Sequence, residues 1–303
     1  MAVQAQAAGK KETTRGRTDL AGYLFVGPFL IVYAAFLIFP ALLGLRMSFY
    51  NASLVGADAQ FLGLANFKEL FGDPNFWTSL WHTVLFTLLS TPPLVLLSLA
   101  LALLANRAIP ARWFFRLSFF APWVLPSSVV ALIWVWLYQP GFGLINGYLT
   151  AIGLPEIAWL PDERVAMISV VIATVWWTLG FNFVLYLAGL QDIPRELYEA
   201  AAIDGAGPWQ QIRMITVPLL ARTTTLVVVL QVIASLKVFD QMYIMTSGGP
   251  NFSTRSALQY IYDEGFTNFR VGYASALSML FFLVVLAVSA AWFILVRRQE
   301  KEV

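Results

Sequence analysis

Long runs of apolar residues recur along the whole chain, and they constrain its fold more than any other feature of the sequence. A transmembrane helix needs about 20 mainly apolar residues, and six segments of the sequence reach that length. The 303 residues are 59% hydrophobic and 12% charged, whereas a soluble domain is about 25% charged. The mean hydropathy of +0.72 agrees. The sequence therefore predicts an integral membrane protein.

The six predicted spans cover residues 23–49, 81–105, 114–138, 165–187, 219–240 and 273–296. Prolines interrupt the first three, at Pro28 and Pro40, at Pro92–Pro93, and at Pro122 and Pro126. Spanning helices tolerate proline where neighbouring helices and hydroxyl groups satisfy the freed backbone groups. The expected fold is all-α, a polytopic membrane protein with six transmembrane helices.

The N-terminal segment, residues 1–19, is polar and contains Lys10, Lys11, Arg15 and Arg17. The apolar stretch that follows is too long for the core of a signal peptide, and no small-residue cleavage pattern closes it. We expect residues 1–19 to form a disordered cytoplasmic tail and residues 20–303 to form the membrane domain.

Basic residues are distributed unevenly between the predicted loops, and this asymmetry predicts orientation. The tail, the segment between the second and third spans and the C-terminal end are basic, the last two through Arg107, Arg112, Arg116, Arg297, Arg298 and Lys301. The alternate loops, 50–79, 139–164 and 241–272, carry mixed charges. Because lysine and arginine mark the cytoplasmic side, both termini are expected inside, which requires an even number of spans.

The loop between the fourth and fifth spans, residues 188–218, departs from this charge rule. It should be cytoplasmic, yet its two arginines are outnumbered by acidic residues, namely Asp192, Glu196, Glu199 and Asp204. Asp192 suits an N-cap and Pro194 a first turn, and Gly205 suits the residue after a helix. A helix, a glycine turn and a second helix beginning near Pro208 are expected within residues 191–218.

A spaced pattern within this loop resembles one family specifically. Glu199-Ala200-Ala201, Gly205, Ile215 and Pro218 stand at the spacing of the Glu-Ala-Ala signature of permeases in binding-protein-dependent ABC importers. Val217 stands where leucine is usual, and Ile212 where the carbohydrate-uptake type usually has phenylalanine. That type also has Asp204, Ala206 and Trp209, which are present here.

Two further stretches support the same resemblance. Residues 61–67, followed by Asp73–Pro74, precede the second span, and Phe239–Asp240 and residues 246–250 follow the fifth. Together they are similar to the first of the paired permeases in maltose-type and glycerol-phosphate-type importers. The resemblance covers roughly residues 23–298.

The resemblance implies a division of labour between subunits. The loop would form a coupling helix that docks on a cytoplasmic ATPase, through Glu199, Ala200, Ala201, Asp204, Gly205, Ala206, Trp209, Ile215 and Pro218. The implied partners are a second permease, forming a heterodimer, two ATPase subunits and an extracytoplasmic solute-binding protein, assembled in the lipid of a bacterial inner membrane. The implied solute is a sugar, an oligosaccharide, a sugar alcohol or a glycerol phosphate.

Several kinds of chemical site have no basis in the sequence. There are no cysteines, and His82 is the only histidine, which excludes disulfides and metal sites built from cysteines or several histidines. No Gly-x-x-x-x-Gly-Lys-Ser/Thr phosphate loop is present. We expect no catalytic residue, metal or cofactor in this chain and no nucleic-acid partner, with ATP and Mg bound by the partner ATPase.

Polar residues inside the predicted spans are candidates for a solute path: Asn182, Tyr186, Gln231, Lys237 and Asp240. The first three would serve equally as hydrogen bonds between helices. Lys237 and Asp240, three residues apart, would share a helical face, either lining the path or forming a snorkelling pair at the interface. Asp263 and Glu264 are expected in a solvated outer loop rather than as an acid–base couple.

Two other classes of protein remain as alternatives. An autonomous secondary transporter or channel would need intramembrane ion relays and often an internal repeat, and no repeat is evident. A membrane enzyme would need clustered acids, histidines or a nucleophile at the interface, and none is evident.

Overall fold

The computed structural model describes residues 15–53, 59–106 and 112–299, with side chains for residues 23–53, 59–106 and 112–294. Helices make up most of the described chain. Its strands are an antiparallel pair of two residues each, β1 (Tyr50–Asn51) and β2 (Gln60–Phe61), in which Tyr50 lies opposite Phe61. The all-α prediction is confirmed.

Four helical segments are long and apolar enough to cross a membrane: Tyr23–Met47, Pro74–Ala105, Glu163–Gln191 and Val271–Ile294. The first of them runs through α1 (Arg15–Tyr33), η1 (Ala34–Ile38) and α2 (Phe39–Met47). The other three belong to α4 (Pro74–Ala105), α8 (Glu163–Gln191) and α15 (Val271–Gln299). Two bent helix pairs complete the set, so the described chain has six spans when each pair counts as one.

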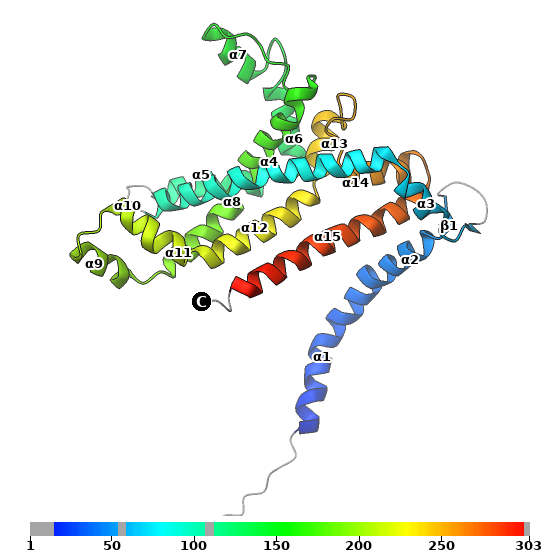
Figure 1. Cartoon of the computed structure of the whole chain (residues 1–303), viewed down its shortest axis with the longest axis horizontal. Coiled ribbons are helices and arrows are strands. Elements are labelled where there is room, and N and C mark those ends of the chain that lie inside the picture. Colours follow the sequence, from blue (N-terminus) through cyan, green and yellow to red (C-terminus); the bar gives the residue numbers. More distant parts are fainter. Residues whose placement is uncertain (1–14, 54–58, 107–111, 300–303) are drawn as a thin grey trace, which may run out of the picture.

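The third predicted span is not one continuous helix. It consists of α5 (Arg112–Val124) and α6 (Ser127–Leu137), which meet at an angle of 100°. Pro126, between them, has an extended backbone with ψ of 142°. Proline lacks the N–H needed to continue a helix and restricts the residue before it, so the helix ends and restarts in a new direction. From α6 the chain runs into α7 (Leu144–Ala151), away from the main bundle (Figure 1).

The fifth predicted span also breaks at both ends. Its membrane helix is α12 (Ala221–Leu236), bent by 62° from the preceding segment, and a separate helix, α13 (Asp240–Thr246), follows it. Within residues 219–240, α12 forms most of the span, and only Leu219 and Asp240 at the two ends belong to the neighbouring helices.

The centre of the molecule is a bundle in which α4 packs on α8 and α12, with α5 against α8 (Figure 1). Tyr186, Phe183 and Leu220 lie in a buried cluster between α4, α8 and α12. Close approach needs small residues, because a Cβ added at Gly180 of α8 would lie 2.5 Å from the carbonyl oxygen of Phe119 in α5. Small residues allow membrane helices to pack by van der Waals contact where the hydrophobic effect is weak.

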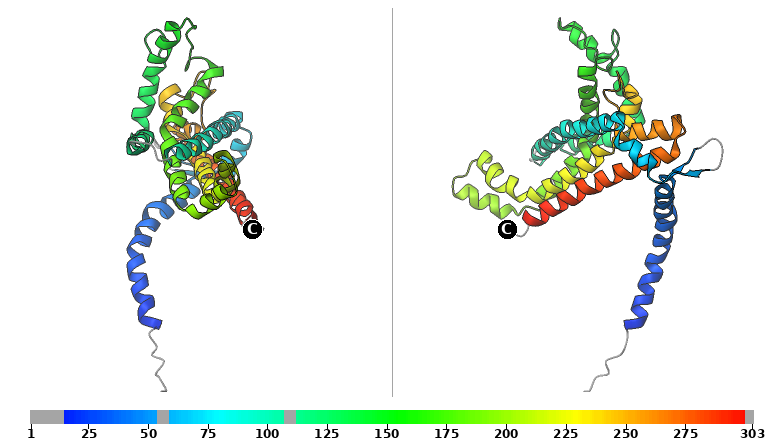
Figure 2. Two further views of the ribbon diagram at one scale, coloured as in Figure 1. Left: turned by 90° about the vertical axis from the view of Figure 1, so that its left-hand side faces the viewer. Right: turned by 45° about the vertical axis from the view of Figure 1, so that its right-hand side comes forward.

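The N-terminal span stands apart from this bundle. Figure 2 shows α1 running away from the rest of the molecule, while α2 contacts α15. Its apolar side chains are exposed, including Phe25 at 87% and Phe36 at 79%. An apolar surface of this size requires cover by lipid or by another protein.

The end of the bundle near β1 and β2 holds three short helices, α3 (Ala65–Phe71), α14 (Ala257–Tyr262) and η3 (Asp263–Thr267). These helices pack around the start of α4 and of α15, where Phe76, Tyr260 and Leu277 are buried together. The opposite end carries α9 (Arg195–Ile203), as Figure 1 shows. On the orientation predicted from the basic loops, the α9 end faces the cytoplasm.

Candidate functional site

The predicted helix–turn–helix is present in the loop between α8 and α12. It consists of α9, α10 (Pro208–Gln211), η2 (Ile212–Thr216) and α11 (Val217–Leu219). Pro208 is the first residue of α10, as expected. The N-cap prediction for Asp192 was wrong, since Asp192 caps the C-terminus of α8 and Pro194 stands at the N-cap of α9. Helix is disfavoured in the residue before a proline, so α9 begins after Pro194.

Gly205 makes the turn that follows α9. Its φ is +81°, a region open to glycine but costly for other residues. Ala206 N–H donates to the Ala201 carbonyl at 2.8 Å, and Gly205 N–H donates to Ala202 at 3.1 Å. These two bonds form a Schellman motif, which satisfies the last carbonyls of the helix. A Cβ at Gly205 would meet nothing within 4 Å, so the requirement for glycine is conformational.

The α9–α10 turn presents charged and apolar side chains to its surroundings. Glu199, Ala200 and Asp204 are exposed, and Ile203 and Trp209 are 87% and 73% exposed. The other predicted coupling residues are less prominent: Ala201, Ala206 and Ile215 are half-buried, while Gly205 and Pro218 are exposed. Exposed large apolar residues rimmed by charge are typical of a protein-binding surface.

Three residues that the sequence pattern did not single out hold this turn together. The hydroxyl groups of Tyr198 and Thr216 lie 2.9 Å apart, and Gln211 Nε2 donates to the Ala206 carbonyl at 3.2 Å. Thr216 is buried. These bonds link α9 to the helical segment that leads into α12. A force applied at α9 would therefore reach α12 through side-chain contacts as well as through the backbone.

A cleft of about 290 Å³ opens where the α5–α6 break meets α8, the end of α12 and the start of α13. Three of the predicted path residues, Gln231, Lys237 and Asp240, line this cleft. The other two do not: Tyr186 is fully buried in the bundle, and Asn182 is 1% exposed.

Asn182 and Gln231 belong to a chain of hydrogen bonds between helices. Asn182 Nδ2 donates to Gln231 Oε1 at 3.0 Å, and Gln231 Nε2 donates to Ser235 Oγ at 2.9 Å. Ser235 Oγ lies 3.2 Å from Ser90 Oγ of α4. The geometry favours the interhelical role for Asn182. Gln231 combines that role with a place at the cleft wall.

Lys237 and Asp240 do not share a helical face, and this prediction was wrong. Lys237 caps the C-terminus of α12, whereas Asp240 begins α13. Asp240 instead accepts a hydrogen bond from Ser127 Oγ at 2.6 Å, which joins α13 to the start of α6. Both charged side chains are exposed at the cleft.

Aromatic rings that were not among the predicted path residues form another part of the cleft wall. The ring centroids of Trp123 and Trp177 are 5.6 Å apart, and Trp177 Nε1 donates to the Leu125 carbonyl at 3.1 Å. Phe239 also lines the cleft. Their place depends on the α5–α6 break, so only the prolines flanking Trp123 signalled it in the sequence.

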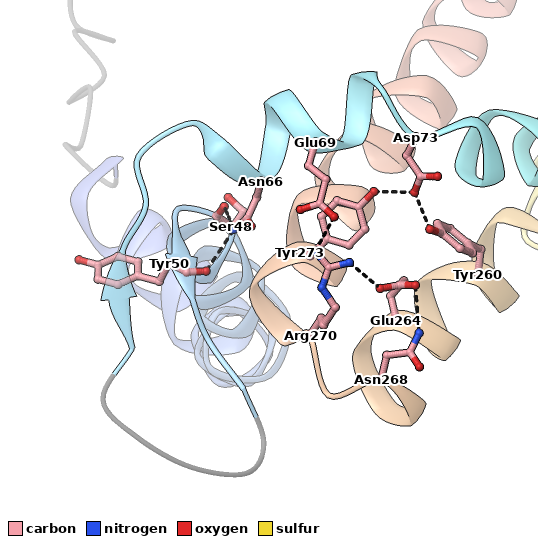
Figure 3. A network of polar contacts seen from close by, with 10 residues as sticks. All are labelled: Ser48, Tyr50, Asn66, Glu69, Asp73, Tyr260, Glu264, Asn268, Arg270 and Tyr273. Carbon is pink, nitrogen blue, oxygen red and sulfur yellow. Dashed lines mark hydrogen bonds and ion pairs between the residues drawn. The ribbon is translucent and has the colours of Figure 1, made fainter.

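The stretch at residues 61–74 is explained by a polar network at the other end of the bundle (Figure 3). Asn66 Nδ2 donates to the carbonyls of Ser48 and Tyr50, at 2.9 and 3.1 Å, and so ties α3 to the start of the hairpin. Asp73 caps α4 by accepting from Asn75 N–H at 2.9 Å.

Asp73 also accepts from the hydroxyl groups of Tyr260 and Tyr273, at 2.5 and 2.6 Å. Burial acts to raise the pKa of Asp73, but the hydrogen bonds from the two tyrosines and from the backbone outweigh it and lower the pKa. The carboxylate therefore holds α4, α14 and α15 together at one point.

Glu264 is not solvated, in contrast to the prediction. It is 8% exposed and accepts hydrogen bonds from Asn268 at 3.0 Å and from Arg270 at 3.2 Å (Figure 3). Arg270 also pairs with Glu69 of α3 at 2.5 Å. A buried carboxylate needs such partners, and they give Glu264 a structural role in the η3 turn.

The comparison with protein families identifies the chain. Residues 95–301 match the family described as "Binding-protein-dependent transport system inner membrane component". The chain belongs to this family. It is the permease subunit of an ABC importer and a multi-pass membrane protein. Among the described residues of this permease, no group of three or more metal-binding side chains lies together.

Characterised relatives match the permease over nearly their full length. The permease protein of the sulfoquinovosyl glycerol transport system of Agrobacterium fabrum is 36% identical, over 93% of this chain and 92% of its own. The trehalose/maltose permease protein of Thermococcus litoralis is 36% identical, over 88% and 90%. An sn-glycerol-3-phosphate permease protein of Agrobacterium fabrum is 34% identical, over 91% and 94%.

A solved structure shares the fold of this permease. It belongs to a bacterial ABC transporter involved in the import of the acidic polysaccharide alginate, with a TM-score of 0.81 and 26% identity, over 93% of this chain and 96% of the other. A second structure of an alginate transporter, in complex with an alginate pentasaccharide-bound periplasmic protein, has a TM-score of 0.80.

Proposed function

We propose that this permease forms one half of a pathway that carries a sugar or related solute across the bacterial inner membrane, driven by a separate ATPase. The solute class would be an oligosaccharide, a sugar alcohol or a glycerol phosphate. The relatives named for such solutes, and the alginate transporters of the same fold, support this class. The observation that carries the proposal is the exposed α9–α10 turn with its Glu-Ala-Ala signature, in which Val217 replaces the usual leucine.

The coupling step follows from the geometry of that turn. Glu199 and Asp204 would offer negative charge to the ATPase, and Ile203 and Trp209 would supply apolar contact area. The Schellman turn at Gly205 fixes the angle between α9 and α10, and the Tyr198–Thr216 bond ties α9 to the segment before α12. Closure of the ATPase on ATP, with its Mg, would then move α12 and the cleft beside it.

The cleft has the chemistry that a carbohydrate requires. Sugars bind through hydrogen bonds to their hydroxyl groups and through apolar contact with aromatic rings. Trp123, Trp177 and Phe239 supply the rings, and Gln231 and Asp240 supply hydrogen-bonding groups. Lys237 adds a positive charge that would suit a phosphate-bearing solute. The cleft is open, so a second permease would complete the pathway and an extracytoplasmic binding protein would deliver the solute.

The coupling role is tested with paired glycine variants. Gly205→Val in the turn and Gly141→Val at the far end are well matched, because both glycines have a φ near +80° and open space around them. Each valine carries a similar strain, on the order of 1–2 kcal/mol. Glu199→Gln, with Glu196→Gln on the same helix as its control, tests the charge.

We expect Gly205→Val and Glu199→Gln to lower solute-stimulated ATP hydrolysis by about tenfold or more in the purified complex, equivalent to about 1.4 kcal/mol of lost coupling. The two control variants should retain hydrolysis, and all four proteins should insert in the membrane. Unchanged hydrolysis and uptake in both test variants would refute the assignment of α9 as the coupling helix.

A further inference from the structure

A second cavity, larger than the cleft, lies at the α9 end of the bundle. Its volume is about 520 Å³, and its wall combines the ends of α4 and α8 with the starts of α5 and α9. Three arginines line it, Arg112, Arg116 and Arg195, together with the neutral hydrogen-bonding side chains of Asn106, Gln191 and Tyr198. No carboxylate is among the described residues that line it. The proposed transport function uses none of these cationic groups.

Only some of the hydrogen-bond donors of Arg116 have a partner. Its Nη2 donates to the carbonyl of Ala105, at the C-terminus of α4, at 3.3 Å. Its Nε is inaccessible to solvent and has no hydrogen-bond partner in the described part of the chain. An unpartnered donor on a charged group costs free energy, and three guanidinium groups around one cavity repel each other. A bound anion relieves the repulsion between the guanidinium groups.

The chemistry of the wall points to phosphate. Guanidinium groups bind phosphate oxygens bidentately, and the side-chain amides of Asn106 and Gln191 can donate to the remaining oxygens. We propose that this cavity binds a phosphate group, and that its natural source is the headgroup of an anionic phospholipid in the cytoplasmic leaflet. Basic pockets between transmembrane helices on the cytoplasmic side are suited to such headgroups.

The surroundings of the cavity favour a lipid over a soluble phosphate. The cavity lies where α4 ends and α5 begins, and the limits of these two spans place it near a membrane surface. On α5, beside Arg112 and Arg116, the side chains of Trp113, Phe114 and Leu117 are 68%, 54% and 57% exposed. Tryptophan is enriched at this depth of a bilayer. Acyl chains can therefore lie along α5 while the phosphate reaches the arginines.

Occupancy of the cavity has a consequence for α9. Arg195 and Tyr198 belong to α9, whereas Arg112 and Arg116 belong to α5. A phosphate bound to Arg195 and to the two arginines of α5 braces the start of α9 against the membrane bundle. If α9 is the coupling helix, as proposed above, the anionic lipid content of the membrane then tunes ATP hydrolysis. The binding itself does not depend on that role.

Lipid retention tests the binding directly. The complete transport complex is purified in detergent, exposed to equal amounts of phosphatidylglycerol and phosphatidylcholine, and analysed by native mass spectrometry. We expect selective retention of phosphatidylglycerol, weakened by salt as charge interactions are. Arg112→Gln combined with Arg116→Gln should lower this retention about tenfold or more, given the fold-change expected for each basic residue near an anionic surface.

Two further variants control for folding and for total charge. Arg164→Gln removes an exposed arginine at the opposite end of α8 and should leave retention unchanged. Arg112→Lys with Arg116→Lys keeps the positive charge and should restore most of the retention. Inorganic phosphate is added as a competitor to identify the source of the phosphate group. Retention of phosphatidylglycerol that inorganic phosphate does not reduce supports the lipid headgroup. Tight binding of inorganic phosphate that the arginine variants abolish would instead support a soluble phosphate compound and overturn the lipid assignment.

Three results would overturn the proposal. The first is equal retention of the two lipids by the unmodified complex. The second is equal loss of retention in the Arg164→Gln control and in the double glutamine variant. The third is loss of the ATPase subunit from the double glutamine variant with lipid retention intact, since the arginines would then serve a protein contact. Failure of the coupling test at Gly205 would not affect the conclusion on lipid binding, because the two tests are independent.

Discussion

At the scale of single residues, one carboxylate joins three helices at the end of the permease near β1 and β2. Asp73 caps α4 and accepts from two tyrosine hydroxyl groups that belong to α14 and α15. Hydrogen bonds to a charged acceptor are stronger than those between neutral groups. Asp162 caps α8 in the same way, accepting from Arg164 N–H at 2.9 Å, and is exposed.

We expect Asp73→Asn to destabilise the permease more than Asp162→Asn, by about 1–3 kcal/mol, because it also weakens the bonds to Tyr260 and Tyr273. Thermal unfolding of the two purified variants measures the difference. Equal midpoints would show that the tyrosine bonds contribute nothing beyond the cap.

The carboxylate of Asp73 should also make the stability of the folded permease depend on pH. Its pKa in the folded protein lies below the reference value of 3.8, so its contribution to stability is present above that value. The contribution is lost as the pH falls through the lower folded-state pKa. In Asp73→Asn, this part of the acid sensitivity should be absent.

At the scale of elements, the fit between α5 and α8 depends on a glycine. Glycine to alanine in a helix interior normally stabilises by about 0.5–1 kcal/mol. At Gly180 a Cβ would lie 2.5 Å from the Phe119 carbonyl oxygen, whereas at Gly147 in α7 nothing lies within 4 Å. Alanine substitutions at the two positions therefore separate the effect of helix propensity from the effect of helix packing.

We expect Gly180→Ala to lower the unfolding midpoint and to reduce solute uptake, since α5 must move away from α8 and Trp123 moves with it. Gly147→Ala should leave the midpoint unchanged or raise it. Circular dichroism melts and uptake into vesicles provide the two measurements. A stabilised, fully active Gly180→Ala protein would contradict the packing between α5 and α8.

At the scale of the whole molecule, the permease has the form of a part rather than a complete transporter. Its cleft is open, its N-terminal span is exposed, and its α9–α10 turn presents exposed apolar side chains. Proteoliposomes containing this chain alone should show no solute uptake, with or without a proton or sodium gradient. Uptake should appear only when the second permease, the ATPase, the binding protein and ATP are supplied. Gradient-driven uptake by the isolated chain would instead support an autonomous secondary transporter.

The sequence by itself determined the spans, the all-α class and the α9–α10 turn. These features are local: hydropathy reports burial in lipid residue by residue, and Gly205 with its Glu-Ala-Ala signature needs only short-range spacing to be recognised. The bends were signalled less clearly. Pro126 marked a possible kink, but its 100° angle depends on what α6 packs against.

Only the tertiary structure decided which polar residues meet. Asn182 is paired with Gln231 across 49 residues, Asp240 with Ser127 across 113, and Asp73 with Tyr273 across 200. The sequence cannot distinguish a polar residue that lines a cleft from one that binds a neighbouring helix, because both satisfy the same need for a partner in an apolar medium. That choice is made by the packing of α4, α8 and α12, where helices distant in sequence become neighbours.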